Sequence, residues 1–246
     1  MRVSRPRGSC GGAATGRPPD PLHARGLEKR FGAVCALAGV DVQVPTGAVV
    51  GLVGPNGSGK STLLAVVAGL LRADAGTALV DGRPAGTIEA ARSLALVPDD
   101  PSGLDELTVR EHTALLHALH RAEGVEARRS ELAEAFELEP LLDRSLGALS
   151  RGQRRRAALA AAFALDVPLL LVDEATTTLD HTAVAALCDA IADATARGAG
   201  VLLATHDREF VSAVCDTVLE LRGGEIVDEL LPFGQQAEAP CDPVAV

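Results

Sequence analysis

The stretch GPNGSGKS at residues 54–61 has the residue types and spacing of a phosphate-binding loop. It fits G-x-x-x-x-G-K-[ST] in full, between an apolar run and a helical pattern. Glycines let the backbone wrap around an anion, and the helix start adds a positive dipole end. Lys60 is expected to reach the β- and γ-phosphates of a nucleotide, and Ser61 to give its hydroxyl to Mg²⁺. The predicted nucleotide contacts are Gly54, Pro55, Asn56, Gly57, Ser58, Gly59, Lys60, Ser61 and Thr62.

Two acidic residues, Asp173 and Glu174, follow the apolar run LLLV at residues 169–172. Ligands of open α/β sheets bind at the carboxyl ends of the strands, so this pair is expected beside the phosphate loop. Asp173 is placed to hold Mg²⁺ through water, and Glu174 to polarise the water that attacks the γ-phosphate. Many strands end in acidic turns, so the pair is informative only together with the loop.

Composition limits the classes of protein that the chain can belong to. Its 246 residues are 47% hydrophobic and 23% charged, which is typical of a globular domain. No apolar stretch approaches the length that crosses a bilayer. The formal net charge of −10 argues against broad binding to nucleic acid. The five cysteines are widely spaced without C-x-x-C, which favours reduced thiols over disulfides or a zinc site.

The hydrophobic pattern predicts an α/β fold that positions these motifs. Apolar and alternating runs predict strands that are separated by helical segments, which implies a parallel, helix-covered sheet. A mainly helical insertion interrupts the alternation, and TVLELRGGEIVDEL near the end predicts a hairpin. The predicted strands are 39–45, 46–54, 76–84, 93–98, 167–175 and 199–207, and the predicted helices are 61–71, 108–124, 125–143, 181–198 and 208–216.

Both ends of the chain differ in composition from the rest. Residues 1–24 are rich in Gly, Pro and Arg without a hydrophobic period or a secretory signal, so we expect disorder. The basic residues there are interpreted as solvated, with contact to anionic lipid as the alternative. The folded domain is predicted at 25–232, and 233–246 as a flexible tail.

Three further motifs complete an ordered set. LSRGQ at 149–153 precedes a helix, TTLD at 177–180 follows Glu174, and ATHD at 204–207 ends an apolar strand. With the phosphate loop and LLLVDE, these motifs resemble the ATP-binding cassette (ABC) family over roughly residues 25–231. The resemblance implies a P-loop NTPase fold with a mainly parallel sheet, an N-terminal antiparallel β portion and an inserted α-helical lobe at about 88–150.

The resemblance also implies roles for individual residues. Two such domains would pack head to tail and hold each ATP between the phosphate loop of one and LSRGQ of the other. Phe31 matches the position that stacks on adenine, and His206 matches the switch histidine that contacts the γ-phosphate and positions water. LSRGQ matches the family's signature motif LSGGQ, and Arg151 replaces the middle glycine of that signature. The implied ATP contacts from the second domain are Ser150, Gly152, Gln153 and Asp180. The implied catalytic residues are Glu174, His206 and Lys60.

Asp99, in LALVPDDP, stands where the family has a glutamine that binds Mg²⁺. An aspartate also offers a hard oxygen ligand, but it is one methylene shorter and carries a full charge. We expect it to attract the metal and to repel the γ-phosphate whenever the metal is absent. The alternative is a solvated acidic turn with no role as a ligand.

Two other polar clusters have simpler interpretations. The run RRR at 154–156 is read as a solvated helix face or as intersubunit contacts rather than an RNA-binding patch, because the whole chain is acidic. Only His117 and His120, of the three histidines at 112, 117 and 120, have a helical i,i+3 spacing. No cysteine joins them, so a solvated helix face is favoured over a metal site.

The family resemblance implies an ATP-binding and ATP-hydrolysing subunit, with ATP and Mg²⁺ as cofactors. It would form a homo- or heterodimer that drives a separate membrane permease from the cytoplasmic face of the membrane. LTVREH at 107–112 resembles exporter-type cassettes. The alternatives are a soluble cassette ATPase of ribosomes, DNA repair or cofactor assembly, and a non-catalytic nucleotide-binding regulator.

Overall fold

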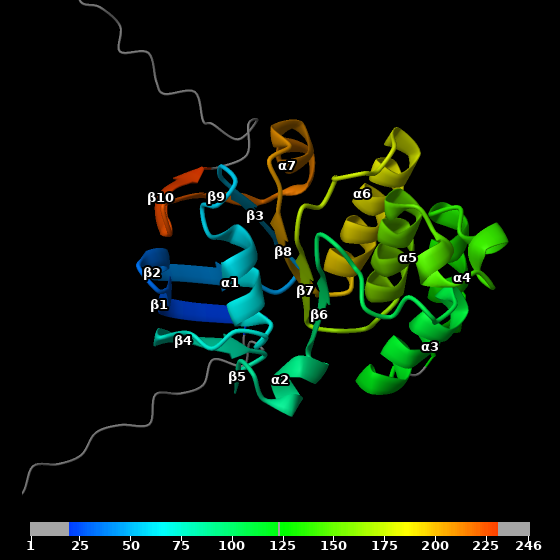
Figure 1. Cartoon of the computed structure of the whole chain (residues 1–246), viewed down its shortest axis with the longest axis horizontal. Helices are drawn as coiled ribbons and strands as arrows, with labels where there is room; N and C mark the ends of the chain where they lie inside the picture. The colour runs from blue at the N-terminus through cyan, green and yellow to red at the C-terminus, as the bar shows by residue number, and fades with distance from the viewer. Residues whose placement is uncertain (1–19, 123, 231–246) are drawn as a thin grey trace, which may run out of the picture.

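The computed structural model describes residues 20–122 and 124–230, which form two β-sheets and the helices that cover them (Figure 1). Most of the segment 1–24 and all of the tail 233–246 lie outside these ranges, so their predicted disorder stays a prediction. The first strand begins at Leu22, so the folded domain starts before the predicted boundary at residue 25.

The smaller sheet is antiparallel and the larger one is mainly parallel, as predicted. The smaller sheet has the order β2-β1-β4-β5, with β1 (Leu22–Phe31), β2 (Val34–Val44), β4 (Ala75–Val80) and β5 (Arg83–Pro84). The larger sheet has the order β10-β9-β3-β8-β7-β6, and only the hairpin β9–β10 in it is antiparallel. Its strands are β3 (Val49–Val53), β6 (Leu94–Val97), β7 (Leu169–Val172), β8 (Gly200–Ala204), β9 (Thr217–Arg222) and β10 (Glu225–Leu230).

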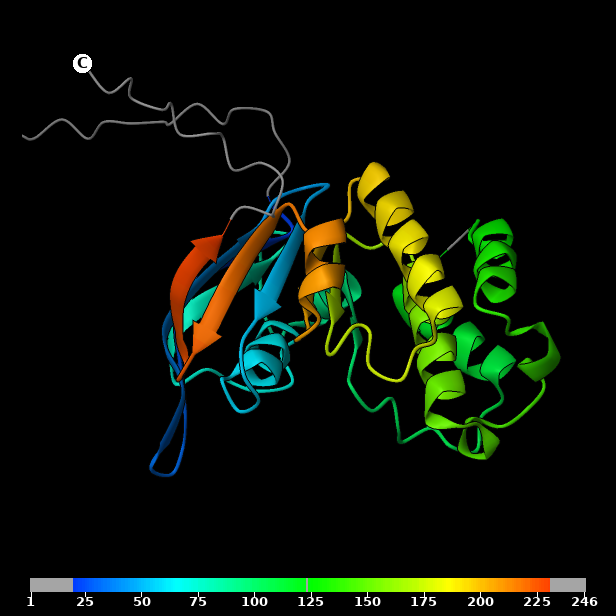
Figure 2. The same ribbon diagram turned by 90° about the horizontal axis from the view of Figure 1, so that it is seen from above.

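The helices lie on both sides of the larger sheet. Helix α1 lies between the two sheets, whereas α5 and α6 cover the opposite face and α3 and α4 lie beyond them (Figures 1 and 2). Within the described ranges, no helix is both long and apolar enough to span a bilayer. The helices are α1 (Lys60–Val67), α2 (Ile88–Arg92), α3 (Val109–His120), α4 (Glu126–Ala135), α5 (Arg151–Phe163), α6 (His181–Ala196) and α7 (Arg208–Val214).

Successive residues of the parallel strands face two different cores. In β7, Leu170 and Val172 belong to the core beneath α5 and α6, whereas Leu169 and Leu171 belong to the core that contains α1. This follows from the two-residue period of a strand whose two faces are both covered by helices or sheet. Burial on both faces fixes where each strand ends, and the strand ends carry the predicted site.

The helical lobe begins later than residue 88. Strand β6 falls inside the predicted range 88–150, yet it pairs in parallel with β7 along its whole length and belongs to the larger sheet. The lobe therefore starts after Val97. The prediction of a solvated histidine face is also wrong for His117, which is buried. His117 lies on the inner face of α3, four residues after Thr113 and eight after Val109, which are both buried.

The reactivity of the Cys215 thiol tests how α7 packs against β3. Its thiol is buried, and burial raises the pKa of the Cys215 thiol to about 12. Iodoacetamide at pH 8 should therefore alkylate the partly exposed Cys35 well before Cys215, because the thiolate is the reactive form. Peptide mapping by mass spectrometry measures both sites, and urea-unfolded protein is the control in which both react. Equal rates in the folded protein would contradict this packing.

Candidate nucleotide-binding site

The phosphate loop joins the end of β3 to the start of α1. Gly59 is the N-cap of α1 with φ +112°, and a side chain there would meet the Ala36 carbonyl oxygen, so glycine is required. The helix has no side-chain cap, so its first N–H groups point into the loop. The hydroxyl oxygen of Ser58 is buried without a hydrogen-bond partner in the described residues. The loop is thus a cradle of N–H and O–H donors of the kind that binds phosphate.

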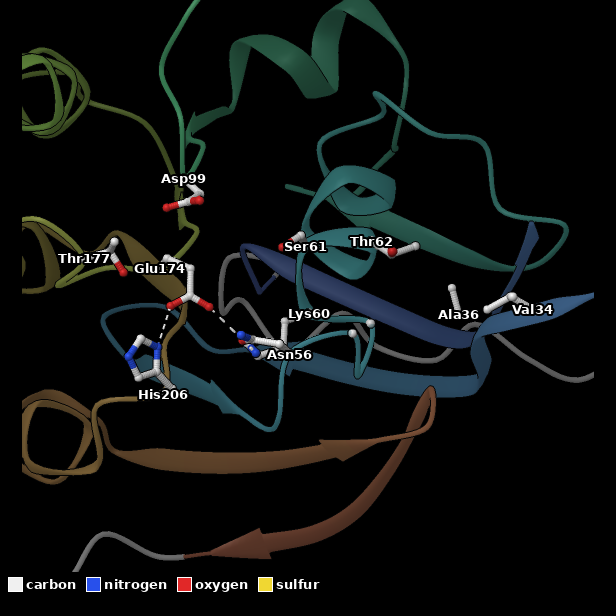
Figure 3. Close-up of a pocket in the computed structure, with 12 residues that line it drawn as sticks. Val34, Ala36, Asn56, Lys60, Ser61, Thr62, Asp99, Glu174, Thr177 and His206 are labelled. Carbon is white, nitrogen blue, oxygen red and sulfur yellow. Dashed lines mark hydrogen bonds and ion pairs between the residues drawn. The ribbon is translucent and has the colours of Figure 1, made fainter. Parts of the chain in front are cut away.

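A cavity of about 470 Å³ opens over this loop. Figure 3 shows side chains from α1, from the ends of β6 and β7 and from the segment after β8 converging on it. The site residues predicted from sequence that line it are Asn56, Gly57, Gly59, Lys60, Ser61, Thr62, Asp99, Glu174 and His206. Val34, Ala36 and Thr177 also line it, although they were not predicted as contacts.

Glu174 connects three elements in this cavity. Its carboxylate Oε2 lies 2.9 Å from His206 Nδ1, and its Oε1 lies 3.8 Å from Lys60 Nζ. With an ionised carboxylate, His206 Nδ1–H is the donor. The backbone of Glu174 has φ +48°, a strained conformation for a residue other than glycine. Lys60 Nζ also donates to the Gly54 carbonyl oxygen at 2.8 Å, so the lysine is held in the loop.

Asp173 and Ser61 present oxygens to the same edge of the sheet. Burial raises the pKa of the Asp173 carboxyl, and the Ser61 hydroxyl partly opposes this rise. Asp173 Oδ1 is buried with no hydrogen-bond partner among the described residues. An orphaned carboxylate oxygen beside a hydroxyl is the donor set that suits a hard cation such as Mg²⁺. In the described ranges no three His, Cys, Asp or Glu side chains gather as a metal site, so nucleotide and water oxygens would have to complete the coordination.

Asp99 lies beyond the end of β6 and lines the same cavity as Glu174, whose carboxylate points away from it toward Lys60 and His206 (Figure 3). Its side chain is exposed at the cavity wall. Its charge reaches the buried residues below, because it raises the pKa of Asp173 and favours the charged form of Arg155. Asp99 therefore faces the nucleotide cavity, as the metal-ligand interpretation requires, while its exposure also leaves the solvated-turn alternative open.

The signature residues lie apart from the phosphate loop. Ser150, Gly152, Gln153 and Asp180 line a second cavity of about 520 Å³ that shares no lining residue with the first. Ser150 and Gln153 form a capping box at the start of α5: the Ser150 hydroxyl accepts from Gln153 N–H, and the Gln153 side chain accepts from Ser150 N–H. A Cβ on Gly152 would lie 2.8 Å from the Thr178 carbonyl oxygen, so only glycine allows this approach. Asp180 caps α6 by accepting from Ala183 N–H at 2.9 Å.

Phe31 is not among the residues that line the first cavity. It ends β1, opposite Val34 in the hairpin, and 49% of it is exposed. Lys29 Nζ lies 5.6 Å from the centre of its ring, which is within the range of a cation–π contact. Its register partner Val34 lines the cavity, so the hairpin does bring this end of β1 to the rim of the site.

The fold and the phosphate cradle define a P-loop NTPase: a parallel strand, a glycine-rich loop and a helix start, with an acidic strand end beside them. The sequence profile of the family described as ABC transporter matches residues 37–177. The chain is 33% identical over 204 residues to the SkfA peptide export ATP-binding protein SkfE of Bacillus subtilis (strain 168), covering 79% of this chain and 83% of that protein. The chain therefore belongs to the ABC transporter family, as one of its ATP-binding, ATP-hydrolysing subunits.

Solved structures of the same family agree with the fold. An ATP-binding subunit of an ABC transporter superposes with a TM-score of 0.81 at 30% identity, covering 85% of this chain and 89% of that one. The bacterial ABC transporter cassette MJ0796, solved as a dimer, superposes with a TM-score of 0.78 at 26% identity, covering 87% of this chain and 99% of that one. ATPase subunits of this family dimerise and act with membrane permeases, so a transport role is favoured over the soluble alternatives.

Substitution of Lys60 tests the cradle. Lys60→Ala should lower the affinity for ATP by about tenfold or more, because a hydrogen bond to a charged group contributes about 1.5–3 kcal/mol. Fluorescence titration with a labelled ATP analogue measures this loss. Arg110→Ala, which breaks an exposed ion pair with Asp143 in the lobe, is the control and should bind normally. Undiminished ATP binding by Lys60→Ala would contradict the assignment of the loop.

Proposed function

We propose that the chain binds Mg²⁺-ATP between the phosphate loop of one subunit and the signature of a second, and that hydrolysis there drives a separate permease. The observation that supports this most strongly is the separation of the two cavities. One chain presents donors for phosphate at α1 and a second set at the start of α5, and they share no lining residue. A head-to-tail dimer would unite a copy of each, which would account for four predicted contacts that line the second cavity and not the first: Ser150, Gly152, Gln153 and Asp180.

In this proposal the residues of the first cavity position ATP and the attacking water. Lys60 leaves its carbonyl partner in the loop and binds the β- and γ-phosphates, since a phosphate is the stronger acceptor. Glu174, freed from Lys60, accepts a proton from the attacking water, and His206 donates its Nδ1–H to orient the carboxylate. The backbone N–H groups of the loop stabilise the charge that develops on the transferred phosphoryl group.

The residues that would hold Mg²⁺ are Ser61, Asp173 and Asp99. When bound, the ion would neutralise part of the charge on the nucleotide phosphates. The orphaned Oδ1 of Asp173 and the adjacent Ser61 hydroxyl support this assignment. Phe31 is proposed to stack on adenine from the rim of the cavity, where its exposed ring is available. From the second subunit, Ser150, Gly152 and Gln153 would close over the γ-phosphate, and Asp180 would approach the same site.

We further propose that the permease is an exporter and that the subunit acts at the cytoplasmic face of the membrane. The relative SkfE is named for peptide export, and LTVREH at the start of α3 resembles the corresponding stretch of exporter-type cassettes. The helical lobe, which projects from the sheet, is the proposed contact surface for the permease (Figure 2).

Neutralising Glu174 tests the catalytic proposal. Glu174→Gln should lower the turnover of ATP by about 10²–10⁴-fold, the usual contribution of a general base. ATP binding should persist, so that an ATP-bound dimer accumulates. Phosphate release and light scattering after size-exclusion chromatography with Mg²⁺-ATP measure both effects.

Asp189→Asn, on the exposed face of α6, is the matched control for this charge change and should keep both turnover and the monomer–dimer balance. Unchanged turnover in Glu174→Gln would refute its role as the base.

A further inference from the structure

The three consecutive arginines of α5 differ in burial and in their partners. Arg154 pairs with Asp105 at 3.5 Å, and Arg156 pairs with Glu137 at 3.0 Å, both near the surface. Arg155 is only 1% exposed and forms no ion pair among the described residues. The prediction of a solvated helix face is therefore wrong for Arg155.

Arg155 joins the ends of two neighbouring strands from beneath the nucleotide cavity. Its guanidinium donates to the carbonyl oxygen of Pro98, which follows β6, and to those of Asp173 and Glu174, which follow β7. The Glu174 carbonyl lies 3.0 Å from Nη2. Two of these acceptors belong to Asp173 and Glu174, whose carboxylates lie at the edge of the sheet, and the third, Pro98, directly precedes Asp99. A planar guanidinium can contact several acceptors at once, which an ammonium group cannot do in the same geometry.

Burial of this charge has a consequence for the acidic edge. A buried guanidinium without a paired carboxylate is costly unless negative charge lies close by. Burial lowers the pKa of the Arg155 guanidinium. The charges of the three carboxylates oppose this shift, and Asp99 contributes more than Asp173 or Glu174. Asp99 in turn stands where the family has an uncharged glutamine. Asp99 directly follows Pro98, whose carbonyl oxygen accepts from Arg155, so the extra negative charge is attached next to a backbone group that the buried guanidinium holds.

We propose that Arg155 is a positioning residue that fixes the ends of β6 and β7 and offsets the charge of Asp99, so that ATP phosphates can approach the acidic edge. The inference rests on the proposed function of Asp173 and Glu174. It also connects the two half-sites of one chain, because Arg155 lies on α5, the helix that the signature residue Ser150 caps.

A double-mutant cycle between Arg155 and Asp99 tests the proposal. ATP affinity is measured by fluorescence titration in EDTA and in Mg²⁺, and the ATPase rate is resolved into kcat and KM. Arg155→Gln should weaken ATP binding in EDTA by about fivefold or more, the order expected for one uncompensated charge at an effective dielectric constant of about 20. Binding in Mg²⁺ should fall less, because the metal neutralises the same edge.

Asp99→Asn in the Arg155→Gln background should restore the affinity in EDTA to that of Asp99→Asn alone. Arg154→Gln is the matched control on the adjacent helix position and should equal the wild type in both media. Wild-type affinity of Arg155→Gln in EDTA would overturn the proposal. Strict additivity of the two effects on ATP affinity would also overturn it. If Arg155 were only structural, replacing Asp99 with a neutral residue would not change the effect of Arg155→Gln.

Arg155→Lys separates positioning from charge. It keeps the charge but cannot bridge both strand ends, so ATP affinity in EDTA should stay near the wild-type value while kcat falls by about tenfold or more. If Arg155→Gln does not fold, this variant decides alone, and a wild-type kcat overturns the proposal. Failure of the Glu174→Gln test would instead overturn the proposed function, so the two outcomes are distinguishable.

Discussion

The balance of charge at one edge of the larger sheet is the constraint on which the site depends. Three carboxylates, from Asp99, Asp173 and Glu174, share this edge with a loop built to receive phosphates. Carboxylates and phosphates repel each other unless cations lie between them. Lys60, 3.8 Å from Glu174, supplies one positive charge, and the buried Arg155 supplies another from below. The orphaned oxygen of Asp173 marks where a metal ion would supply the third.

The fold delivers these groups because parallel strands end at the same edge. β3, β6, β7 and β8 are buried on both faces, so their apolar runs end where the polar site residues begin. Helix α5 then crosses behind β6 and β7 and carries Arg155 to their ends. The signature residues at its first turn line the second cavity. In the proposed dimer, one helix would thus serve the site of its own chain and present the signature to the site of another.

Most of this site could be predicted from the sequence because its motifs are local. The loop before Lys60 and the acidic pair after β7 are each encoded in a few adjacent residues. The role of Arg155 could not be predicted, because its partners are carbonyl groups brought close only by tertiary packing. Within the run RRR, the sequence does not distinguish the buried Arg155 from Arg154 and Arg156. His117 is different: it follows Thr113 by four residues and Val109 by eight, a spacing that indicates an inner helix face and that the i,i+3 pairing with His120 obscures.

A structure of the dimer with Mg²⁺ and a non-hydrolysable ATP analogue tests the central claim most directly. The distances that decide it are those from the γ-phosphate to the loop of one chain and to the signature of the other. We expect the γ-phosphate to lie between Lys60 of one chain and the partner subunit's Ser150, with the metal bound at Ser61 and near Asp173. A nucleotide held by one chain alone, with both signatures remote from it, would contradict the head-to-tail site.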